Sequence, residues 1–302
     1  MVVESGTRTR LTPRRAESGL GWWQRRSVRS RTWLAAVYGL LAVGLVLVTL
    51  PFFWMVSTSL KSTSDVFAYP IMWIPQELRW DNYPKALQAG NFLRALANTL
   101  SIAVPVVIGE ALTCSLVGYG FARIRFPGRD LLFLFVISTM MLPRQVTIIP
   151  TYIVFRSLGW VDTYLPFWIP AYLAGGAFYV FLMRQFFLSI PPELDDAARV
   201  DGCGSLGIFW RIMMPLAKPA VAAVALFTFM ASWNDFFGPL IYLQSPEKHT
   251  LALMLALFQN AFRVEWGQQM AAATLIMLGP ILVFFFGQRV FIQGIVFTGI
   301  KG

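Results

Sequence analysis

The stretch ELDDAARVDGCGSLGIFWRIMMP, residues 193–215, separates two apolar runs that are each long enough to cross a membrane. Ser189 can cap a helix that starts after the two prolines of SIPPELDD, where three acidic residues suit the positive end of the helix dipole. Gly202 is expected to end this helix, because glycine accepts the left-handed backbone that often follows a helix. The pattern predicts a short helix over 193–200. Its expected apolar edge consists of Leu194, Ala197, Ala198 and Val200.

A second short helix is expected directly after the glycine-containing turn. Ser205 can cap it, and Pro215 and Pro219 are expected to end it before the next apolar run. Spacing alone leaves open whether this helix pair only packs under membrane spans or docks a partner. The apolar stripe of the second helix, at helical spacing, consists of Leu206, Phe209, Ile212 and Met213.

The composition of the whole chain places it in a membrane. Apolar residues make up 57 % of its 302 residues and charged residues only 13 %, too few to cover the surface of a soluble domain. The formal net charge of +10 comes from basic residues at the edges of apolar runs, without a nucleic-acid-reading motif. Cys114 and Cys203 form neither a disulfide framework nor a metal-ligand spacing. We expect no nucleic acid partner and no bound metal.

Six apolar runs are long enough for membrane helices of about 20 residues. Several contain proline or glycine, which neighbouring helices can accommodate in a membrane. The sequence therefore predicts an all-α membrane protein with six spans. The predicted spans are 33–57, 97–121, 131–150, 164–187, 219–243 and 268–292.

The basic residues orient these spans. An arginine-rich segment precedes the first span, and most of the 25 Lys and Arg residues lie on the same side of the membrane as that segment, which predicts that both termini are cytoplasmic. Residues 1–32 are expected to form a basic cytoplasmic extension, followed by an uncleaved first span. The rest, 33–302, is expected to be one six-span domain. It has a cytoplasmic loop at 188–218 and outer loops at 60–95 and 244–267.

The residues ELDDAARVDG and IFWRIMMPLAKP of the cytoplasmic loop resemble the signature of ABC importer permeases. In that family a Glu-Ala-Ala triplet precedes a glycine and, further on, an Ile-x-x-Pro ending, and here Asp196 stands where the family usually has glutamate. The resemblance implies that the loop is a coupling helix that docks on a separate ATPase subunit. The residues implied in this docking are Glu193, Asp196, Ala197, Ala198, Asp201, Gly202, Ile212 and Pro215.

The similarity extends over about 33–302. It includes GYGFARIRFPGRD, MLPRQVTIIPTYIVFRSLGWVDTYLPFWIP, FLMRQFFLSIPPELDDAARVDG, SWNDFFGPLIYL and FFFGQRVFIQGIVFTGIKG, which in this order resemble the MalG-type permease of carbohydrate ABC importers. The resemblance implies the type I importer permease fold, a sugar-like solute and a bacterial plasma membrane. It also implies four kinds of partner: a second homologous permease, two ATPase subunits, an extracytoplasmic solute-binding protein and membrane lipid. No cofactor is expected on this chain, and ATP and Mg are expected on the partner ATPase, because the chain has no phosphate-loop motif.

Acidic residues inside apolar runs indicate functional positions, because they are costly in a membrane. The Trp233 ring can stack on a sugar, and Asn234 and Asp235 can bond to hydroxyl groups, so these three residues are expected on a substrate pathway. The polar pair can instead satisfy the backbone of a helix that breaks before the following Gly-Pro. Glu110, with no aromatic neighbour, fits an interhelical pair or hydrogen bond. The lone His249 is assigned no role.

Two other classes of function follow from the residues alone. An ion- or proton-driven secondary carrier would use Glu110 and Asp235, but it predicts repeated halves, and no convincing internal repeat is visible. A membrane enzyme would need a cluster of catalytic side chains near one interface, and the sequence shows none. We therefore expect no catalytic residue and no enzymatic activity of the chain itself.

Overall fold

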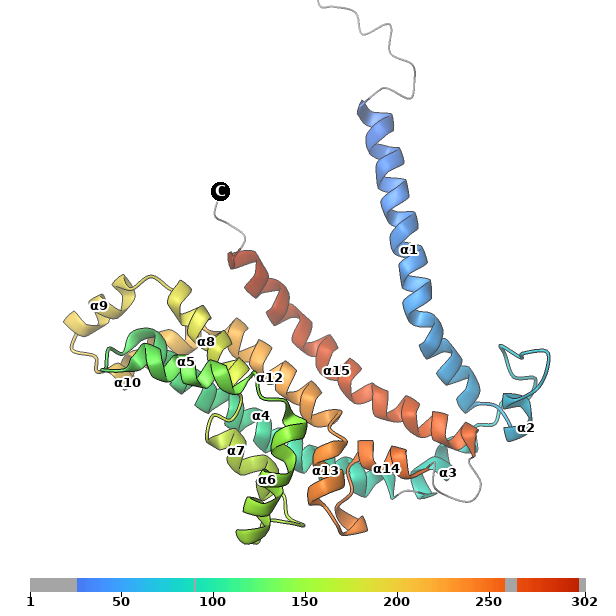
Figure 1. Ribbon diagram of the computed structural model, residues 1–302. Coiled ribbons are helices and arrows are strands. Elements are labelled where there is room, and N and C mark those ends of the chain that lie inside the picture. Colours follow the sequence, from blue (N-terminus) through green and yellow to red (C-terminus); the bar gives the residue numbers. More distant parts are fainter. Residues whose placement is uncertain (1–25, 90, 259–264, 299–302) are drawn as a thin grey trace, which may run out of the picture. The chain divides into compact units, whose positions relative to one another are not determined.

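The computed structural model describes residues 26–89, 91–258 and 265–298. All regular elements in these ranges are helical, and no strand occurs among them, as the sequence predicts. The elements shown in Figure 1 are, in chain order, α1 (Arg26–Ser59), α2 (Thr63–Val66), α3 (Asn82–Ala89), α4 (Phe92–Arg123), α5 (Arg129–Thr139), α6 (Arg144–Ser157), α7 (Leu165–Tyr172), α8 (Ala177–Ser189), α9 (Glu193–Val200), α10 (Ser205–Ile208), the π-helical turn η2 (Phe209–Met213), α11 (Met214–Leu216), α12 (Lys218–Trp233), α13 (Phe237–Tyr242), the 3₁₀ turn η3 (Pro246–Lys248), α14 (Leu251–Leu257) and α15 (Trp266–Thr298).

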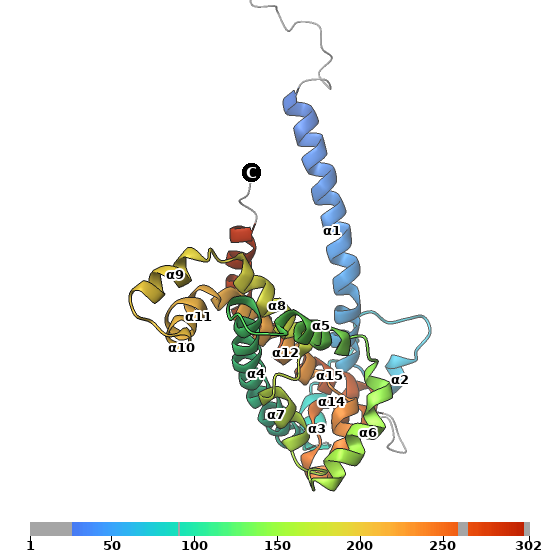
Figure 2. The same ribbon diagram turned by 60° about the vertical axis from the view of Figure 1, so that its left-hand side comes forward.

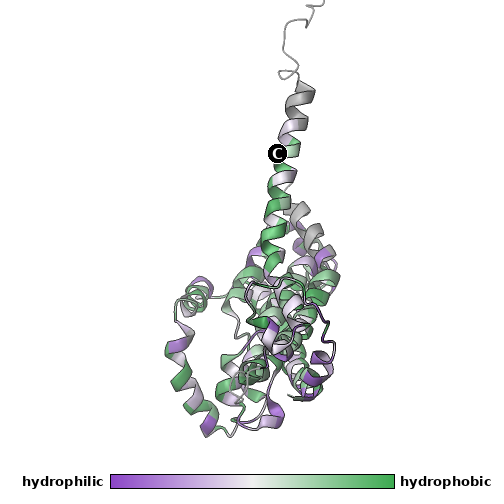
Figure 3. Ribbon diagram, turned by 90° about the vertical axis from the view of Figure 1, so that its right-hand side faces the viewer, coloured by the Kyte–Doolittle hydropathy of each residue, from purple (hydrophilic) through white to green (hydrophobic). Residues whose placement is uncertain are grey.

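The chain divides into two compact units, residues 1–54 and 55–302. The first unit contains most of α1, and Figure 3 colours this helix mainly as apolar. A helix that is apolar all round requires lipid or other apolar helices around it. Because α1 begins at Arg26, the last residues of the predicted extension 1–32 are helical. Residues 1–25 lie outside the described part, so the extension as a whole stays a prediction.

Helix α4 is the centre of the second unit. It packs along α7, α8 and α12, and Figures 1 and 2 both show it running from the region of α3 and α14 to that of α9 and α10. The contact between α4 and α8 is close at Gly118, where an added Cβ would lie 2.8 Å from Met183 Cβ and 2.9 Å from Arg184 N. Only glycine fits there without a backbone shift. We call the two ends of this unit the α9 end and the α14 end.

Helix length confirms four of the six predicted spans, and a fifth can be counted if a bent pair of helices is taken together. Helical segments long and apolar enough to cross a membrane occur, within the described ranges, at Thr32–Ser59, Phe92–Arg123, Leu165–Ser189 and Trp266–Gln288. The third of these segments consists of α7 and α8, counted together as one span. The bent pair consists of Ser205–Leu216 and Lys218–Trp233, which meet at 78°.

The predicted spans 131–150 and 219–243 are broken. The first is divided into α5 and α6, of 11 and 14 residues. Pro143, which has no N–H, is extended at the start of α6 with φ −60° and ψ 132°, and proline also disfavours helix at the residue before it. The second is divided between α12 and α13 at residues 234–236. Helix length therefore does not confirm the count of six.

Candidate functional site

The helix predicted over 193–200 is present as α9 and ends in a Schellman motif. Gly202 has a left-handed φ of 81°, its N–H donates to Arg199 O at 3.0 Å, and the Cys203 N–H donates to Ala198 O at 2.9 Å. These two bonds satisfy carbonyl groups that the end of a helix leaves unpaired. The predicted role of Gly202 in ending the helix is confirmed.

The two serine caps predicted for this loop are wrong. The Ser189 hydroxyl donates to Phe186 O at 2.7 Å, within the last turn of α8. Pro192 is the residue before α9, and its side chain cannot form a capping hydrogen bond. The start of this helix is therefore stabilised by the acidic residues of its first turn, which interact favourably with the helix dipole. Gly204 precedes α10, where no side-chain cap bond is present either.

The apolar edge predicted for α9 is wrong except at Ala198. The buried residues of this helix are Asp195 and Ala198, whereas Leu194 and Ala197 are exposed and Val200 is 88 % exposed. The buried face is therefore chosen by a polar contact of Asp195 and not by apolar periodicity. The predicted coupling residues that are exposed on α9 and its turn are Glu193, Asp196, Ala197, Asp201 and Gly202.

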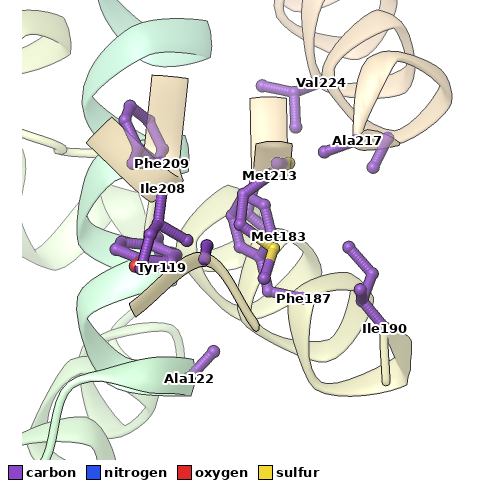
Figure 4. Packing of buried hydrophobic residues seen from close by; sticks show 12 residues of the cluster. Tyr119, Ala122, Met183, Phe187, Ile190, Ile208, Phe209, Met213, Ala217 and Val224 are labelled. Atoms are coloured by element: carbon purple, nitrogen blue, oxygen red, sulfur yellow. The ribbon is translucent and has the colours of Figure 1, made fainter. Parts of the chain in front are cut away.

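The second helix of the loop is anchored in the largest apolar cluster of the described residues. Ile208, Phe209 and Met213 are fully buried, whereas the predicted stripe residue Leu206 is exposed. Figure 4 shows Ile208 and Phe209 beside Tyr119 of α4, and Met213 lies in the same cluster against α8. The π-helical turn η2 contains an extra residue compared with an α-helical turn, which changes the residues that face inward.

The two remaining predicted coupling residues lie near the end of this loop. Ile212 is half-buried in η2 and Pro215 is exposed in α11. Pro215 does not end the helix, which instead bends at Ala217 before α12.

A buried ion pair, which no sequence pattern predicts, joins α9 to α4. Arg123 Nη1 lies 3.6 Å from Asp195 Oδ2, and the two side chains are only 8 % and 5 % exposed. Arg123 Nη2 also donates to Phe187 O at 2.6 Å and to Ile190 O, at the end of α8. Burial raises the pKa of the Asp195 carboxyl, although the charge of Arg123 opposes this shift. One guanidinium group thus joins α4, α8 and α9.

A cavity of about 560 Å³ lies among α4, α6, α7, α8, α12 and α13. Helix α4 contributes residues spaced by three or four, so that one face of the helix lines the cavity over several turns. Hydroxyl and carboxyl groups at this position can bond to a solute with several hydroxyl groups. The polar lining residues are Thr99, Glu110, Thr147, Thr151, Tyr179, Thr228, Ser232, Asp235, Tyr242 and Thr250.

Both acidic residues of the predicted apolar spans, Glu110 and Asp235, line this cavity. Glu110 is buried, accepts a bond from the Cys114 thiol at 2.8 Å and lies so close to Gly176 that an added Cβ there would be 2.7 Å from Glu110 Oε2. Asp235 Oδ1 accepts from the Gly238 N–H at 3.2 Å, where the backbone resumes as α13. Asp235 therefore fits both alternatives that the sequence leaves open. It bonds to the backbone where the helix breaks, and it also lines the cavity.

The other two predicted pathway residues lie elsewhere. Trp233 is only 4 % exposed and packs in an apolar cluster with Phe92 and Leu251, outside the lining of the cavity. Asn234 is exposed, and its amide donates to Met230 O at 2.8 Å. In this structure the Trp233 ring is not the stacking surface that the sequence predicts.

Most of the cavity lining was missed in the sequence, although a signal exists for α12. Thr228 and Ser232 are spaced by four in a largely apolar stretch, which puts their side chains on one face of a helix, and Asp235 follows three residues later, in the break after α12. Thr99 and Glu110 belong to α4 but are too far apart in the sequence to form a visible motif. That both side chains line one cavity is visible only in the folded structure, where the other helices enclose that face of α4.

At the α14 end, Asp162 holds the segment 244–248 in place. Asp162 Oδ1 accepts from the N–H groups of Gln244 and Ser245 at 3.0 Å, and Oδ2 accepts from the Ser245 hydroxyl at 2.5 Å and from Lys248 Nζ at 3.0 Å. The Ser245 hydroxyl and N–H bonds hold the pKa of Asp162 well below its usual range. Asp162 thus orders the chain that leads to η3 and α14.

Asp162→Asn is expected to lower the thermal midpoint of the purified protein at neutral pH, because an amide cannot accept all four of these bonds. A depressed carboxyl pKa stabilises the folded state above the ordinary Asp pKa of about 3.9 and loses this effect as the pH falls towards the folded value. The difference between wild type and variant should therefore shrink as the pH is lowered below about 4. Thermal unfolding followed over this pH range checks the prediction.

Asp81→Asn, in an exposed pair with Lys85, is the control, and its thermal midpoint should change little. An equal effect of both variants would contradict the role of Asp162.

Comparison with known proteins identifies one family profile. The profile described as "Binding-protein-dependent transport system inner membrane component" matches residues 114–296, a range that contains the 193–215 loop and the cavity residues of α12.

Two curated relatives are similar over most of their length. The arabinooligosaccharides transport system permease protein AraQ of Halalkalibacterium halodurans is 35 % identical over 229 residues, with 76 % of this chain and 81 % of the relative covered. The sn-glycerol-3-phosphate transport system permease protein UgpE of Yersinia pestis bv. Antiqua is 32 % identical over 265 residues, with 85 % and 94 % covered.

A solved structure shares the fold. One chain in the crystal structure of a bacterial ABC transporter involved in the import of the acidic polysaccharide alginate matches with a TM-score of 0.71 and 25 % identity. The match covers 91 % of this chain and 98 % of that chain. The arrangement of helices described above therefore recurs in a membrane transporter.

Proposed function

Because the chain belongs to the family of inner membrane components of binding-protein-dependent transport systems, we propose that it is the permease subunit of an ATP-driven importer of a sugar or sugar-like solute. This is the family predicted from the sequence. The observation that carries the proposal is the continuity of α4, which contacts the 193–215 loop at one end and lines a polar cavity in its middle. A transporter needs both parts, a place for the solute and a connection to the energy source.

The lining of the cavity supports a solute with many hydroxyl groups. Hydroxyl groups of threonine, serine and tyrosine and two carboxyl groups reach it from several helices, and such groups form hydrogen bonds with sugars. The relatives are named for arabinooligosaccharides and for glycerol phosphate, which are also polyhydroxylated compounds or their esters. We infer a solute of this general class.

The exposed face of α9 is the proposed docking surface for an ATPase subunit. It presents the carboxyl groups of Glu193 and Asp196 together with Ala197, and the exposed carboxyl group of Asp201 follows in the turn. Asp195 and Ala198 hold the helix from behind. A short helix fixed on one side and exposed on the other fits a groove in a partner. ATP and Mg would bind on that partner, and closure of two ATPase subunits would move this loop.

The other proposed partners complete the pathway. A second homologous permease would provide the other half of the cavity, and an extracytoplasmic solute-binding protein would deliver solute to the outer loops 60–95 and 244–267. Membrane lipid would surround the apolar helices. In this arrangement the protein lies in a bacterial inner membrane, both termini are cytoplasmic, and solute passes by alternating access.

The test is purification of the tagged chain from its native membrane in mild detergent. We expect a second permease and an ATPase subunit to co-purify, and the eluate to hydrolyse ATP faster when the loaded solute-binding protein is added. The rate should be measured with the binding protein alone and with neutral oligosaccharides, polyol glycosides and glycerol phosphate as candidate solutes. A chain that purifies without an ATPase and has no ATP hydrolysis would refute the proposal.

The second candidate is an ion- or proton-driven carrier, because Glu110 and Asp235 line one cavity. It predicts solute uptake by vesicles that contain only this chain and an ion gradient. It also predicts that Glu110→Gln abolishes this uptake. Uptake without a gradient but with ATP and the co-purified subunits would exclude it.

A further inference from the structure

We propose that Arg123 and Asp195 are positioning residues of the coupling step, and that their buried ion pair transmits displacement of α9 to α4. The inference rests on the proposed function, since it concerns how movement of an ATPase reaches the cavity. It assigns this role to two buried residues that lie behind the proposed docking surface.

Helix α9 has few other attachments to the rest of the second unit. Only Asp195 and Ala198 of this helix are buried, and Ala198 offers a single methyl group to the apolar cluster. The other ion pair of α9, between Asp196 and Arg199 at 3.4 Å, lies within the helix and is exposed, so it cannot hold α9 to another element. The contact of Asp195 with Arg123 is therefore the main polar connection of α9 to the helices behind it.

Arg123 is suited to transmit a displacement because its guanidinium group is held on several sides. In addition to Asp195, it binds two backbone carbonyl groups at the end of α8, those of Phe187 and Ile190. The planar, multiply bonded head of arginine keeps a fixed geometry. A shift of α9 that breaks the pair would leave two charges unpaired away from water, which is costly, so α4 and α8 are expected to follow α9.

The second helix of the loop has its own attachment to α4. The Tyr119 hydroxyl donates to Ser205 O at 3.2 Å, and Ile208 and Phe209 lie against the Tyr119 ring (Figure 4). Both helices of the loop are thus fixed to the last turns of α4. The loop and α4 are expected to move together.

Helix α4 carries this movement to the cavity and beyond it. Val106 and Glu110 line the cavity, and Thr99 accepts from the Leu251 N–H at 2.9 Å at the start of α14. Thr99 and Arg123 are roughly 36 Å apart along the helix, at a rise of about 1.5 Å per residue. One continuous helix therefore connects the docking loop, the solute cavity and the outer segment.

The test measures the response of the cavity to the ATPase without needing the solute. Val106→Cys is introduced into the chain after Cys114→Ala and Cys203→Ser. The new thiol is labelled with a membrane-impermeant maleimide in the complex purified with its ATPase subunits. We expect trapping with ATP and vanadate to change the labelling rate by about fivefold or more. In the same background, Arg123→Met combined with Asp195→Leu should reduce this change to less than about twofold, while the ATPase subunits still co-purify and hydrolyse ATP.

The double variant is chosen because well-packed apolar residues can replace a buried ion pair without loss of folding. Arg123→Lys is the second test, since lysine keeps the charge but cannot bond to all three partners in the same geometry, and it should weaken the response as well. Asp130→Asn, in the exposed pair with Arg129 at 3.0 Å, is the matched control at the same end of the molecule and should keep the full response.

Two results would overturn the inference. A full labelling response in the double variant would show that the pair only stabilises the fold, and loss of the ATPase subunits from both variants would show that it serves docking instead of transmission. Failure of the proposed function is distinguishable from both, because then no ATPase would co-purify with the chain that retains Arg123 and Asp195.

Discussion

Trp233→Ala is expected to destabilise the permease by about 3–5 kcal/mol, because it removes a large buried ring and leaves a cavity. The ring is 4 % exposed and packs with Phe92, Leu251 and Met254. It also lies against Gly279 of α15, where an added Cβ would meet it at 2.3 Å. Removal of this ring therefore weakens contacts among α4, α12, α14 and α15 together.

The measurement is the thermal midpoint and the amount of assembled complex, followed by transport per assembled complex. We expect the first two to fall and the third to stay close to wild type, since Trp233 lies outside the lining of the cavity. Asn234→Ala is the matched control, because this neighbouring side chain is exposed and its change should cost no more than about 0.5 kcal/mol. Normal assembly with lost transport would contradict this prediction and restore a pathway role for the ring.

The contrast between Trp233 and Asp235 shows why the pathway was only partly predictable. Both residues have chemistry that suits sugar binding, and residue type alone cannot tell which of them is turned towards the cavity. The break after α12 decides this, since it turns Asp235 towards the cavity and the Gly238 N–H. The ring of Trp233 remains on the helix face that packs against Gly279.

Sequence patterns predicted the ends of α9 correctly where neighbouring residues in the chain determine the structure. Gly202 is identified because a left-handed residue after a helix favours glycine, and the acidic first turn of α9 follows from the helix dipole. The burial of Asp195 was not predictable in this way, because its partner Arg123 belongs to a distant helix. An ion pair between distant segments overrides the apolar periodicity of an eight-residue helix.

Proline residues in similar apolar runs differ in whether the helix continues through them. Pro105 and Pro280 lie inside α4 and α15, whereas Pro143 lies in an extended turn before α6. Neighbouring helices can support a helix that contains proline, and α4 is packed on several sides. The surroundings of each proline, which the sequence does not reveal, therefore decide how many apolar runs remain single helices.

Gly202→Pro is expected to abolish the stimulation of ATP hydrolysis by the solute-binding protein, with a loss of about tenfold or more. Proline requires φ near −65°, whereas Gly202 has φ 81°, and it lacks the N–H that donates to Arg199 O. The turn between α9 and α10 must then change its path. The exposed face of α9, which is the proposed docking surface for an ATPase subunit, would then change its orientation, although the apolar helices should still insert in the membrane.

Gly204→Pro is the matched control for this change, because Gly204 has φ −72°, which proline adopts without strain. It tests whether any proline in the turn is harmful or only one at the left-handed position. The measurement is ATP hydrolysis by the purified complex with and without the loaded solute-binding protein, after the amount of inserted chain has been equalised. Full stimulation in Gly202→Pro would refute the assignment of 193–215 as the coupling loop, and loss in both variants would assign the effect to proline itself. Loss in Gly202→Pro alone would show that the left-handed turn after α9 sets the geometry of coupling.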